Sequence, residues 1–120
     1  MATILTADDT ATMRQMISFT LGSVGHEVVQ ATDGAEALEI ARTRKFDLVI
    51  ADINMPNMDG ITLVKSLRAL PDYRFSPILI LTTESQVEKR QEGRTAGATG
   101  WIVKPFNPEQ LLTIVKKVLG

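Results

Sequence analysis

Five short apolar or β-branched runs, each followed by a longer segment with helical spacing, constrain the fold of this chain more than any other feature. The runs cover residues 3–7, 27–30, 47–51, 77–81 and 100–103. Three of them are nearly all apolar, which is typical of strands buried on both faces of a parallel sheet. Because the runs alternate regularly with helical segments, we predict five βα units rather than buried turns of helix.

The starts of three helices are marked by residue pairs with capping-box spacing. In such a pair, the first side chain accepts a hydrogen bond from a backbone N–H three residues later, and the later side chain returns one. A proline at the first helical position strengthens the third of these signals. The pairs are Asp33 with Glu36, Thr83 with Gln86, and Asn107 with Gln110.

Five consecutive βα units predict an α/β fold with a five-stranded parallel sheet, helices on both faces and right-handed crossovers. The common strand order at this length is 2-1-3-4-5, the flavodoxin-like arrangement. We expect residues 1–120 to form one such domain, because 120 residues leave no room for a separate output domain.

Composition excludes several classes of protein. Hydrophobic residues make up 44% of the chain and charged residues 22%, the balance of a globular domain with its own core. The formal net charge of −1 disfavours nucleic-acid binding through phosphate contacts. There is no cysteine and no apolar stretch long enough to span a membrane, so we expect a cytoplasmic protein with neither disulfides nor thiolate metal sites.

Polar side chains follow four of the five predicted strands. They are Asp8 and Asp9 after the first, Asp52 after the third, Thr82 and Thr83 after the fourth, and Lys104 after the fifth. Each alone has an ordinary explanation: Asp8 and Asp9 suit the start of a helix, and Thr83 suits the cap completed by Gln86. However, the carboxyl ends of parallel strands meet at one edge of a sheet, where ligands bind. We therefore predict that these side chains form one site.

The charge of this predicted site favours a bound cation. Three carboxylates and one lysine leave a net charge of about −2 in a small volume, which either raises carboxylate pKa values or draws in a cation. Oxygen ligands favour Mg²⁺, whereas Zn²⁺ would favour His or Cys. A carboxylate beside Mg²⁺, with a hydroxyl and an ammonium nearby, can attack a phosphoryl group and carry it as an acyl phosphate.

These residues resemble the receiver domains of two-component response regulators. The resemblance covers the whole chain and rests on four pieces in order: Asp8-Asp9, residues 52–60 (DINMPNMDG), residues 81–84 (LTTE) and residues 104–106 (KPF). Because the chain carries no effector domain, it is most similar to the single-domain regulators of chemotaxis.

The resemblance implies a role for each matching residue. Asp52 would accept phosphate from a phosphohistidine, and Mg²⁺ would be held by Asp9, by Asp8 through water, by Asp52 and by the backbone carbonyl of Asn54. Thr82 and Lys104 would contact the phosphoryl group, with the Lys104–Pro105 peptide cis.

Three further positions concern the duration and output of the signal. The resemblance implies that Asn54 and Glu84 tune the lifetime of the phosphate, and that Trp101 occupies an aromatic switch position. The family usually has Tyr or Phe where Trp101 stands, and this departure leaves two interpretations of Trp101. In one, its side chain moves on activation. The other is a half-buried surface aromatic that stays in place in both states.

The expected function is that of a phosphorylation-activated signalling protein rather than an enzyme. Its partners would be a sensor histidine kinase, a target such as a flagellar motor switch protein, and a phosphatase, with the chain itself a monomer. A receiver in a multi-step phosphorelay would share the same chemistry and is a second hypothesis.

An aspartyl phosphatase and a flavin-binding protein fit the residues less well. A phosphatase of the haloacid-dehalogenase type would need Asp-x-Asp, whereas Asp52 is followed by Ile53 and Asn54. A flavin mononucleotide site would need a hydroxyl-rich loop where Asp8 and Asp9 stand.

Overall fold

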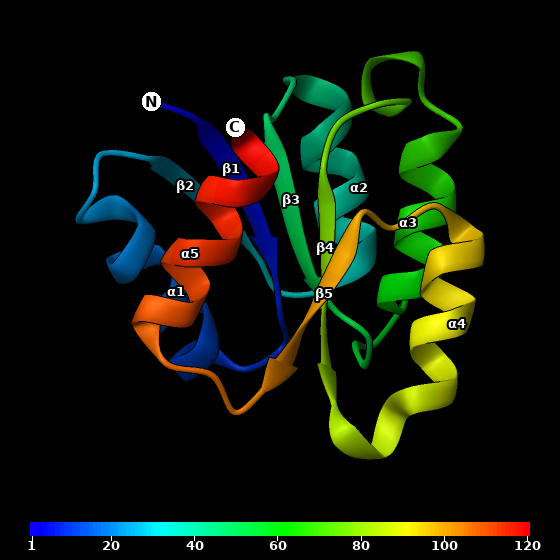
Figure 1. The fold of residues 1–120 in the computed structure, drawn as a ribbon. Coiled ribbons are helices and arrows are strands. Elements are labelled where there is room, and N and C mark those ends of the chain that lie inside the picture. The colour runs from blue at the N-terminus through cyan, green and yellow to red at the C-terminus, as the bar shows by residue number, and fades with distance from the viewer.

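The computed structural model describes residues 1–120, apart from the side chains of Glu84 and Val87. Five strands form one sheet in the order β2-β1-β3-β4-β5, and every neighbouring pair is parallel (Figure 1). The fold class and strand order predicted from the sequence are therefore confirmed. The strands are β1 (Thr3–Ala7), β2 (Glu27–Ala31), β3 (Leu48–Asp52), β4 (Ile78–Thr83) and β5 (Gly100–Lys104).

Helices cover both faces of the sheet. Helices α1 and α5 lie side by side on one face, and α2, α3 and α4 cover the other (Figure 1). The helices are α1 (Ala11–Gly22), α2 (Gly34–Thr43), α3 (Gly60–Arg68), α4 (Val87–Ala96) and α5 (Pro108–Leu119), with short 3-10 turns η1 (Pro71–Tyr73) and η2 (Glu84–Gln86).

The sheet separates two hydrophobic clusters. Ile4 and Ile50 point towards α1 and α5, and Leu5 and Val49 point towards α2 and α3. Every residue of β3 is buried, because helices cover this central strand on both faces. The middle of the sheet is therefore rigid, and the loops at its edge are attached to a fixed frame.

Four strands end later than the sequence pattern predicts. β2 continues by one residue to Ala31. β3 continues to Asp52, β4 to Thr83 and β5 to Lys104, so these polar residues belong to the strands instead of following them. β3 begins at Leu48, one residue later than predicted, and Asp47 before it bonds to Thr3 through both its N–H and its carboxylate, each at 2.8 Å. Parallel pairing depends on backbone groups, and it extends past the point where the apolar pattern stops.

Two of the three predicted helix starts are confirmed. Asn107 and Gln110 form a complete capping box, with hydrogen bonds of 2.8 and 2.9 Å, and Pro108 is the first residue of α5. Asp33 caps α2 by accepting from the Glu36 N–H at 2.8 Å.

The predicted start at Thr83 is wrong. α4 begins at Val87, after the turn η2, and its N-cap residue Gln86 makes no side-chain cap bond. Thr83 remains in β4, where its hydroxyl lies 2.8 Å from the Ser85 hydroxyl and does not cap a helix. One of the two hydrogen bonds of the predicted capping box is present, because the Thr83 N–H donates to the Gln86 side chain at 2.7 Å.

The capping box at Asn107 gives a first testable prediction. Asn107→Ala should lower the free energy of unfolding by about 1 kcal/mol, because the Gln110 N–H loses the side-chain oxygen that accepts its hydrogen bond. Thr10→Ala is the matched control, since Thr10 is the N-cap of α1 but makes no side-chain cap bond. Urea unfolding without divalent ions measures both, and equal losses would contradict the prediction.

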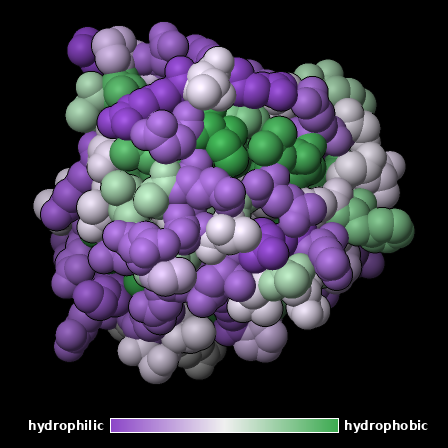
Figure 2. Space-filling model, turned by 180° about the vertical axis from the view of Figure 1, so that it is seen from behind, coloured by the Kyte–Doolittle hydropathy of each residue, from purple (hydrophilic) through white to green (hydrophobic). Residues whose placement is uncertain are grey.

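Among the residues that the structure describes, no helix is long and apolar enough to cross a membrane. The face turned away from the viewer in Figure 1 is mostly hydrophilic, with hydrophobic side chains in small groups (Figure 2).

Candidate functional site

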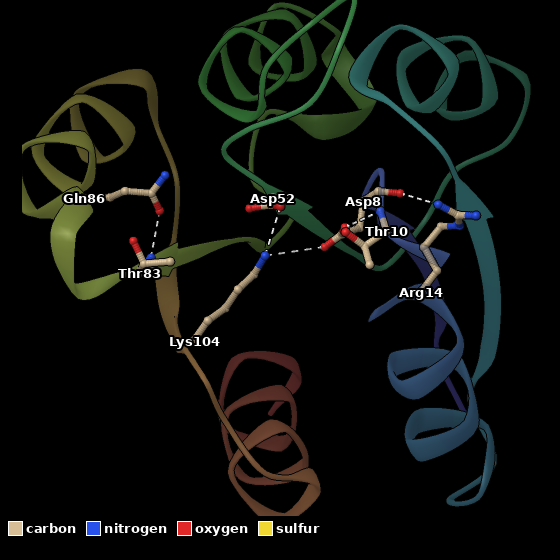
Figure 3. Close-up of polar contacts among 7 residues, drawn as sticks. All are labelled: Asp8, Thr10, Arg14, Asp52, Thr83, Gln86 and Lys104. Atoms are coloured by element: carbon tan, nitrogen blue, oxygen red, sulfur yellow. Dashed lines mark hydrogen bonds and ion pairs between the residues drawn. The ribbon is translucent and has the colours of Figure 1, made fainter. Parts of the chain in front are cut away.

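The ends of three strands bring Asp8, Asp52 and Lys104 together (Figure 3). The Lys104 ammonium reaches across from β5 and lies 3.0 Å from an Asp52 oxygen and 3.8 Å from Asp8 Oδ2. Strands β1, β3, β4 and β5 are neighbours in that order, so the lysine spans the edge of the sheet. The peptide between Lys104 and Pro105 is cis, as predicted.

Asp8 is the most buried ionisable group of the site. Its side chain is 0% exposed, and its Oδ1 accepts a hydrogen bond from the Thr10 N–H at 2.8 Å. Its Oδ2 has no hydrogen-bond partner among the described residues. Burial raises the pKa of the Asp8 carboxyl above its ordinary value, with a further increase from the charge of Asp52, while the Thr10 hydrogen bond and Lys104 lower it.

Asp9 completes a cluster of three carboxylates. One ligand oxygen each from Asp8, Asp9 and Asp52 lies within 4.8 Å of the others, and Asp9 is exposed while the other two are buried. An all-oxygen set with an unpartnered buried carboxylate oxygen fits a hard divalent cation such as Mg²⁺. Lys104 contributes a single positive charge, which leaves the cluster negative.

The interpretation of Asp8 and Asp9 as ordinary helix caps is wrong. The N-cap of α1 is Thr10, and it makes no side-chain cap bond. Asp8 instead directly follows β1, and its N–H donates to the Ala31 carbonyl at 3.1 Å. This backbone bond aligns the carboxylate with the ends of the strands and away from a capping position.

The structure distinguishes the two neighbouring threonines of β4. Thr82 is fully buried, and its hydroxyl has no hydrogen-bond partner within the described part of the chain. Thr83 is half-buried and uses its hydroxyl on Ser85. A buried hydroxyl without a partner is costly, so the side chain of Thr82, not that of Thr83, is available to a ligand.

The loop after β3 is held at its base. The Ile53 N–H donates to the Leu81 carbonyl at 3.3 Å, and the Ile53 carbonyl accepts from the Gly60 N–H at 2.9 Å. Asn54 follows this anchor and is exposed. Glu84, the other residue expected to tune phosphate lifetime, has its side chain outside the described part of the structure.

Trp101 is half-buried on the edge strand β5 and packs against the cluster under α2 and α3. The guanidinium carbon of Arg94 lies 5.2 Å from the centre of a Trp101 ring, and that of Arg90 lies 5.9 Å away. Both distances are typical of cation–π contacts. The structure describes one conformation of Trp101, so its role as a switch stays a prediction.

Sequence reasoning missed Arg14. Its guanidinium donates to the Asp8 backbone carbonyl at 2.7 Å and fixes the turn into α1 (Figure 3). No local signal in the sequence could have identified this contact, because an arginine on a helix usually points to solvent.

A parallel sheet in this order, with acidic side chains and a lysine at its carboxyl edge, defines the class of receiver domains. The family model of the response regulator receiver domain matches residues 4–116, and the chain belongs to this family.

Particular relatives narrow the comparison to chemotaxis proteins. A high-resolution structure of the chemotaxis response regulator CheY4 of Vibrio cholerae is 52% identical in sequence, with a TM-score of 0.94 and 98% of each chain covered. A chemotaxis protein CheY homologue of Campylobacter jejuni is 39% identical over 98% of this chain and 92% of its own length.

Relatives of another kind are longer. The probable transcriptional regulator ycf27 of Porphyridium aerugineum is also 39% identical, over 97% of this chain, but the match covers only 47% of its length. The same receiver unit is thus matched both in proteins of about this length and in proteins about twice as long.

Proposed function

We propose that this chain is a phosphorylation-controlled signalling protein that accepts a phosphoryl group on Asp52. The proposal rests on one observation: some polar atoms at the carboxyl edge of the sheet have hydrogen-bond partners and others have none. Lys104 lies within hydrogen-bond distance of Asp52, while Asp8 Oδ2 and the Thr82 hydroxyl have no hydrogen-bond partner among the described residues. Unpartnered buried polar atoms are costly in a fold that has no use for them.

The reaction needs only groups of this site and a phosphodonor. One Asp52 oxygen attacks the phosphorus of a phosphohistidine, an acyl phosphate forms as the P–N bond breaks, and the imidazole nitrogen keeps the bonding electron pair. Mg²⁺ held by Asp8, Asp9, Asp52 and the Asn54 carbonyl would supply charge neutralisation on the transferred oxygens. Lys104 exchanges its contact with the Asp52 carboxylate for one with the phosphoryl oxygens.

The signal is proposed to pass from Asp52 to the surface of α4, β5 and α5. Phosphorylation adds charge and acceptor oxygens, which favour a shift of Thr82 and Lys104 towards the phosphoryl group. Thr82 is the second-last residue of β4 and Lys104 the last residue of β5, the strand of Trp101, so their movement changes the surroundings of Trp101. To shift the equilibrium between the inactive and active conformations from 1:99 to 99:1, phosphorylation must stabilise the active conformation over the inactive one by about 5.5 kcal/mol.

Control of motility by protein–protein binding is the output that the relatives favour. Both the Vibrio cholerae structure and the Campylobacter jejuni protein are named as chemotaxis regulators, and both match this chain over nearly their whole length. In this proposal a sensor histidine kinase donates the phosphate, and a flagellar motor switch protein binds the phosphorylated form. A phosphorelay receiver would instead return the phosphate to a second histidine protein, which a phosphotransfer assay would detect.

The experiment that tests the chemistry is incubation with Mg²⁺ and acetyl phosphate, followed by mass spectrometry. We expect the wild-type protein to gain one phosphoryl group that mild base removes, and Asp52→Asn to gain none. Asp47→Asn is the matched control, because Asp47 is an exposed aspartate bonded to Thr3 at the opposite end of the sheet. A wild type that gains no phosphate, or an Asp52→Asn variant with the same yield, would sink the proposal.

The fluorescence of Trp101 reports on the switch region in the same samples, since Trp101 is the only tryptophan. We expect its emission to change on phosphorylation. Phosphorylation without any change in emission would leave the chemistry in place and remove Trp101 from the switch.

A further inference from the structure

The loop after β3 makes a second set of contacts that the proposed chemistry does not use, with the start of α2. The Asn57 amide nitrogen donates to Asp33 Oδ2 at 2.6 Å, and the Gly34 N–H donates to the Met58 carbonyl at 3.2 Å. Asp33 and Gly34 are far from Asn57 and Met58 in the chain, so these bonds attach the loop to a neighbouring helix.

The Asp33 carboxylate uses its two oxygens for two different purposes. Oδ1 caps α2 by accepting from the Glu36 N–H at 2.8 Å, and Oδ2 accepts from Asn57. These two hydrogen bonds hold the pKa of the Asp33 carboxyl below its ordinary value, so it remains an acceptor at neutral and mildly acidic pH. One side chain therefore couples the start of the helix to the loop.

The approach of the loop to α2 is close. A Cβ atom added at Gly34 would lie 2.3 Å from the Met58 carbonyl oxygen, so only glycine fits this position. Asn57 is the only non-glycine residue with a positive φ in the described chain, at 67°. Asn adopts this left-handed conformation more easily than most residues, and here it presents its amide to Asp33.

These contacts leave a short stretch of loop between two anchors. Ile53 is fixed by Leu81 and Gly60, and Asn57 and Met58 are fixed by α2. Asn54 lies between them, separated from the second anchor by Met55 and Pro56. Asn54 therefore lies in a short stretch of loop that is held by hydrogen bonds at both ends.

We propose that Asp33, acting through Asn57, is a positioning residue that orients the Asn54 carbonyl for the divalent cation. This inference rests on the proposed metal site, and it adds a residue on α2 that does not touch the cation itself. Supporting contacts of this kind change metal affinity because they fix the direction of a ligand before the metal arrives.

Asp33→Asn separates positioning from capping. An asparagine keeps an oxygen that can cap α2, but it offers Asn57 an N–H in place of a carboxylate oxygen. Asn57 can then bond it only by turning its carboxamide over, and this neutral bond is weaker than the charge-assisted one. We expect the dissociation constant for Mg²⁺ to rise about tenfold. It is measured from the Mg²⁺ dependence of the thermal unfolding midpoint.

The exchanged pair Asp33→Asn/Asn57→Asp tests the mechanism by rescue. The new asparagine amide can donate to the new carboxylate, and Asp also tolerates a positive φ. We expect the Mg²⁺ affinity of this double variant to return to within about twofold of the wild-type value, a margin that matches the usual error of adding the effects of two substitutions. The Mg²⁺ affinity of the single variant Asp33→Asn should stay about tenfold below that of the wild type.

Asp59→Asn controls for loss of a nearby negative charge. Asp59 lies at the end of the same loop and caps α3 by accepting from the Thr62 N–H at 2.7 Å, a bond that asparagine can keep. A loss of Mg²⁺ affinity in Asp59→Asn equal to that in Asp33→Asn would assign the effect to charge and overturn the proposal. A double variant that stays as weak as Asp33→Asn would overturn it as well.

Amide hydrogen exchange without Mg²⁺ separates this inference from the proposed function. Protection of the Gly34 N–H should fall in Asp33→Asn and recover in the exchanged pair, and unchanged protection would refute the positioning role. Absence of any Mg²⁺ effect on the wild type would instead contradict the metal site, and with it the positioning role.

Discussion

Asp8→Asn should make the protein more stable without Mg²⁺ and insensitive to added Mg²⁺. The gain at neutral pH should be about 1–3 kcal/mol, because the variant replaces a buried carboxylate, whose charge is disfavoured by burial and by Asp52, with a neutral amide. An asparagine can still accept from the Thr10 N–H, so the local turn is kept. The wild type should gain about 2.7 kcal/mol at a Mg²⁺ concentration 100 times its dissociation constant.

The pH dependence of this difference has a definite sign. Burial raises the pKa of Asp8 in the folded state, so between its ordinary and raised values the folded protein binds more protons than the unfolded chain. The wild type therefore loses stability as pH rises through this window, and the variant does not. The advantage of Asp8→Asn should be largest at neutral pH and vanish below the ordinary pKa of an aspartate.

Urea unfolding with and without Mg²⁺ measures both effects, and Asp9→Asn is the control. Asp9 belongs to the same cluster but is exposed, so its removal should abolish the Mg²⁺ effect with a smaller gain in metal-free stability. A metal-free Asp8→Asn variant that is less stable than the wild type at neutral pH would contradict our account of the burial of Asp8.

The convergence of the site could be predicted from the sequence because it follows from topology. Once parallel strands are inferred, Asp8, Asp52, Thr82 and Lys104 must meet at the carboxyl edge. The Lys104–Asp52 ion pair was not itself predicted, because strand order places the two residues at the same edge but does not give the path of the lysine side chain.

The contacts that support the site could not be predicted in this way. Arg14 reaches a backbone carbonyl, and Asp33 reaches Asn57 across a loop whose path depends on packing. The sequence indicated only the capping role of Asp33. A cap is recognised from the spacing of nearby residues, whereas a contact with a distant loop leaves no such local pattern. The helix start at Thr83 failed for the opposite reason: a correct local pattern was overridden by the continued pairing of β4 with β5.

Gly60→Ala should cost about 3 kcal/mol of unfolding free energy and impair phosphorylation of Asp52. A Cβ atom at Gly60 would lie 2.2 Å from the backbone oxygen of Asp52, and both groups belong to buried backbone. No side-chain rotation can relieve this contact, so α3 must move away from β3, at a cost typical of severe overpacking. The same movement displaces Asp52 relative to Lys104.

The sign of this effect distinguishes steric contact from helix propensity. Gly60 begins α3, and alanine in a helix is otherwise more stable than glycine by about 0.5–1 kcal/mol. Gly22→Ala is the matched control, because Gly22 ends α1 and a Cβ there meets nothing within 4 Å. Urea unfolding should therefore show a gain for Gly22→Ala and a loss for Gly60→Ala. A gain in both would mean that the close approach of α3 to Asp52 does not constrain the site.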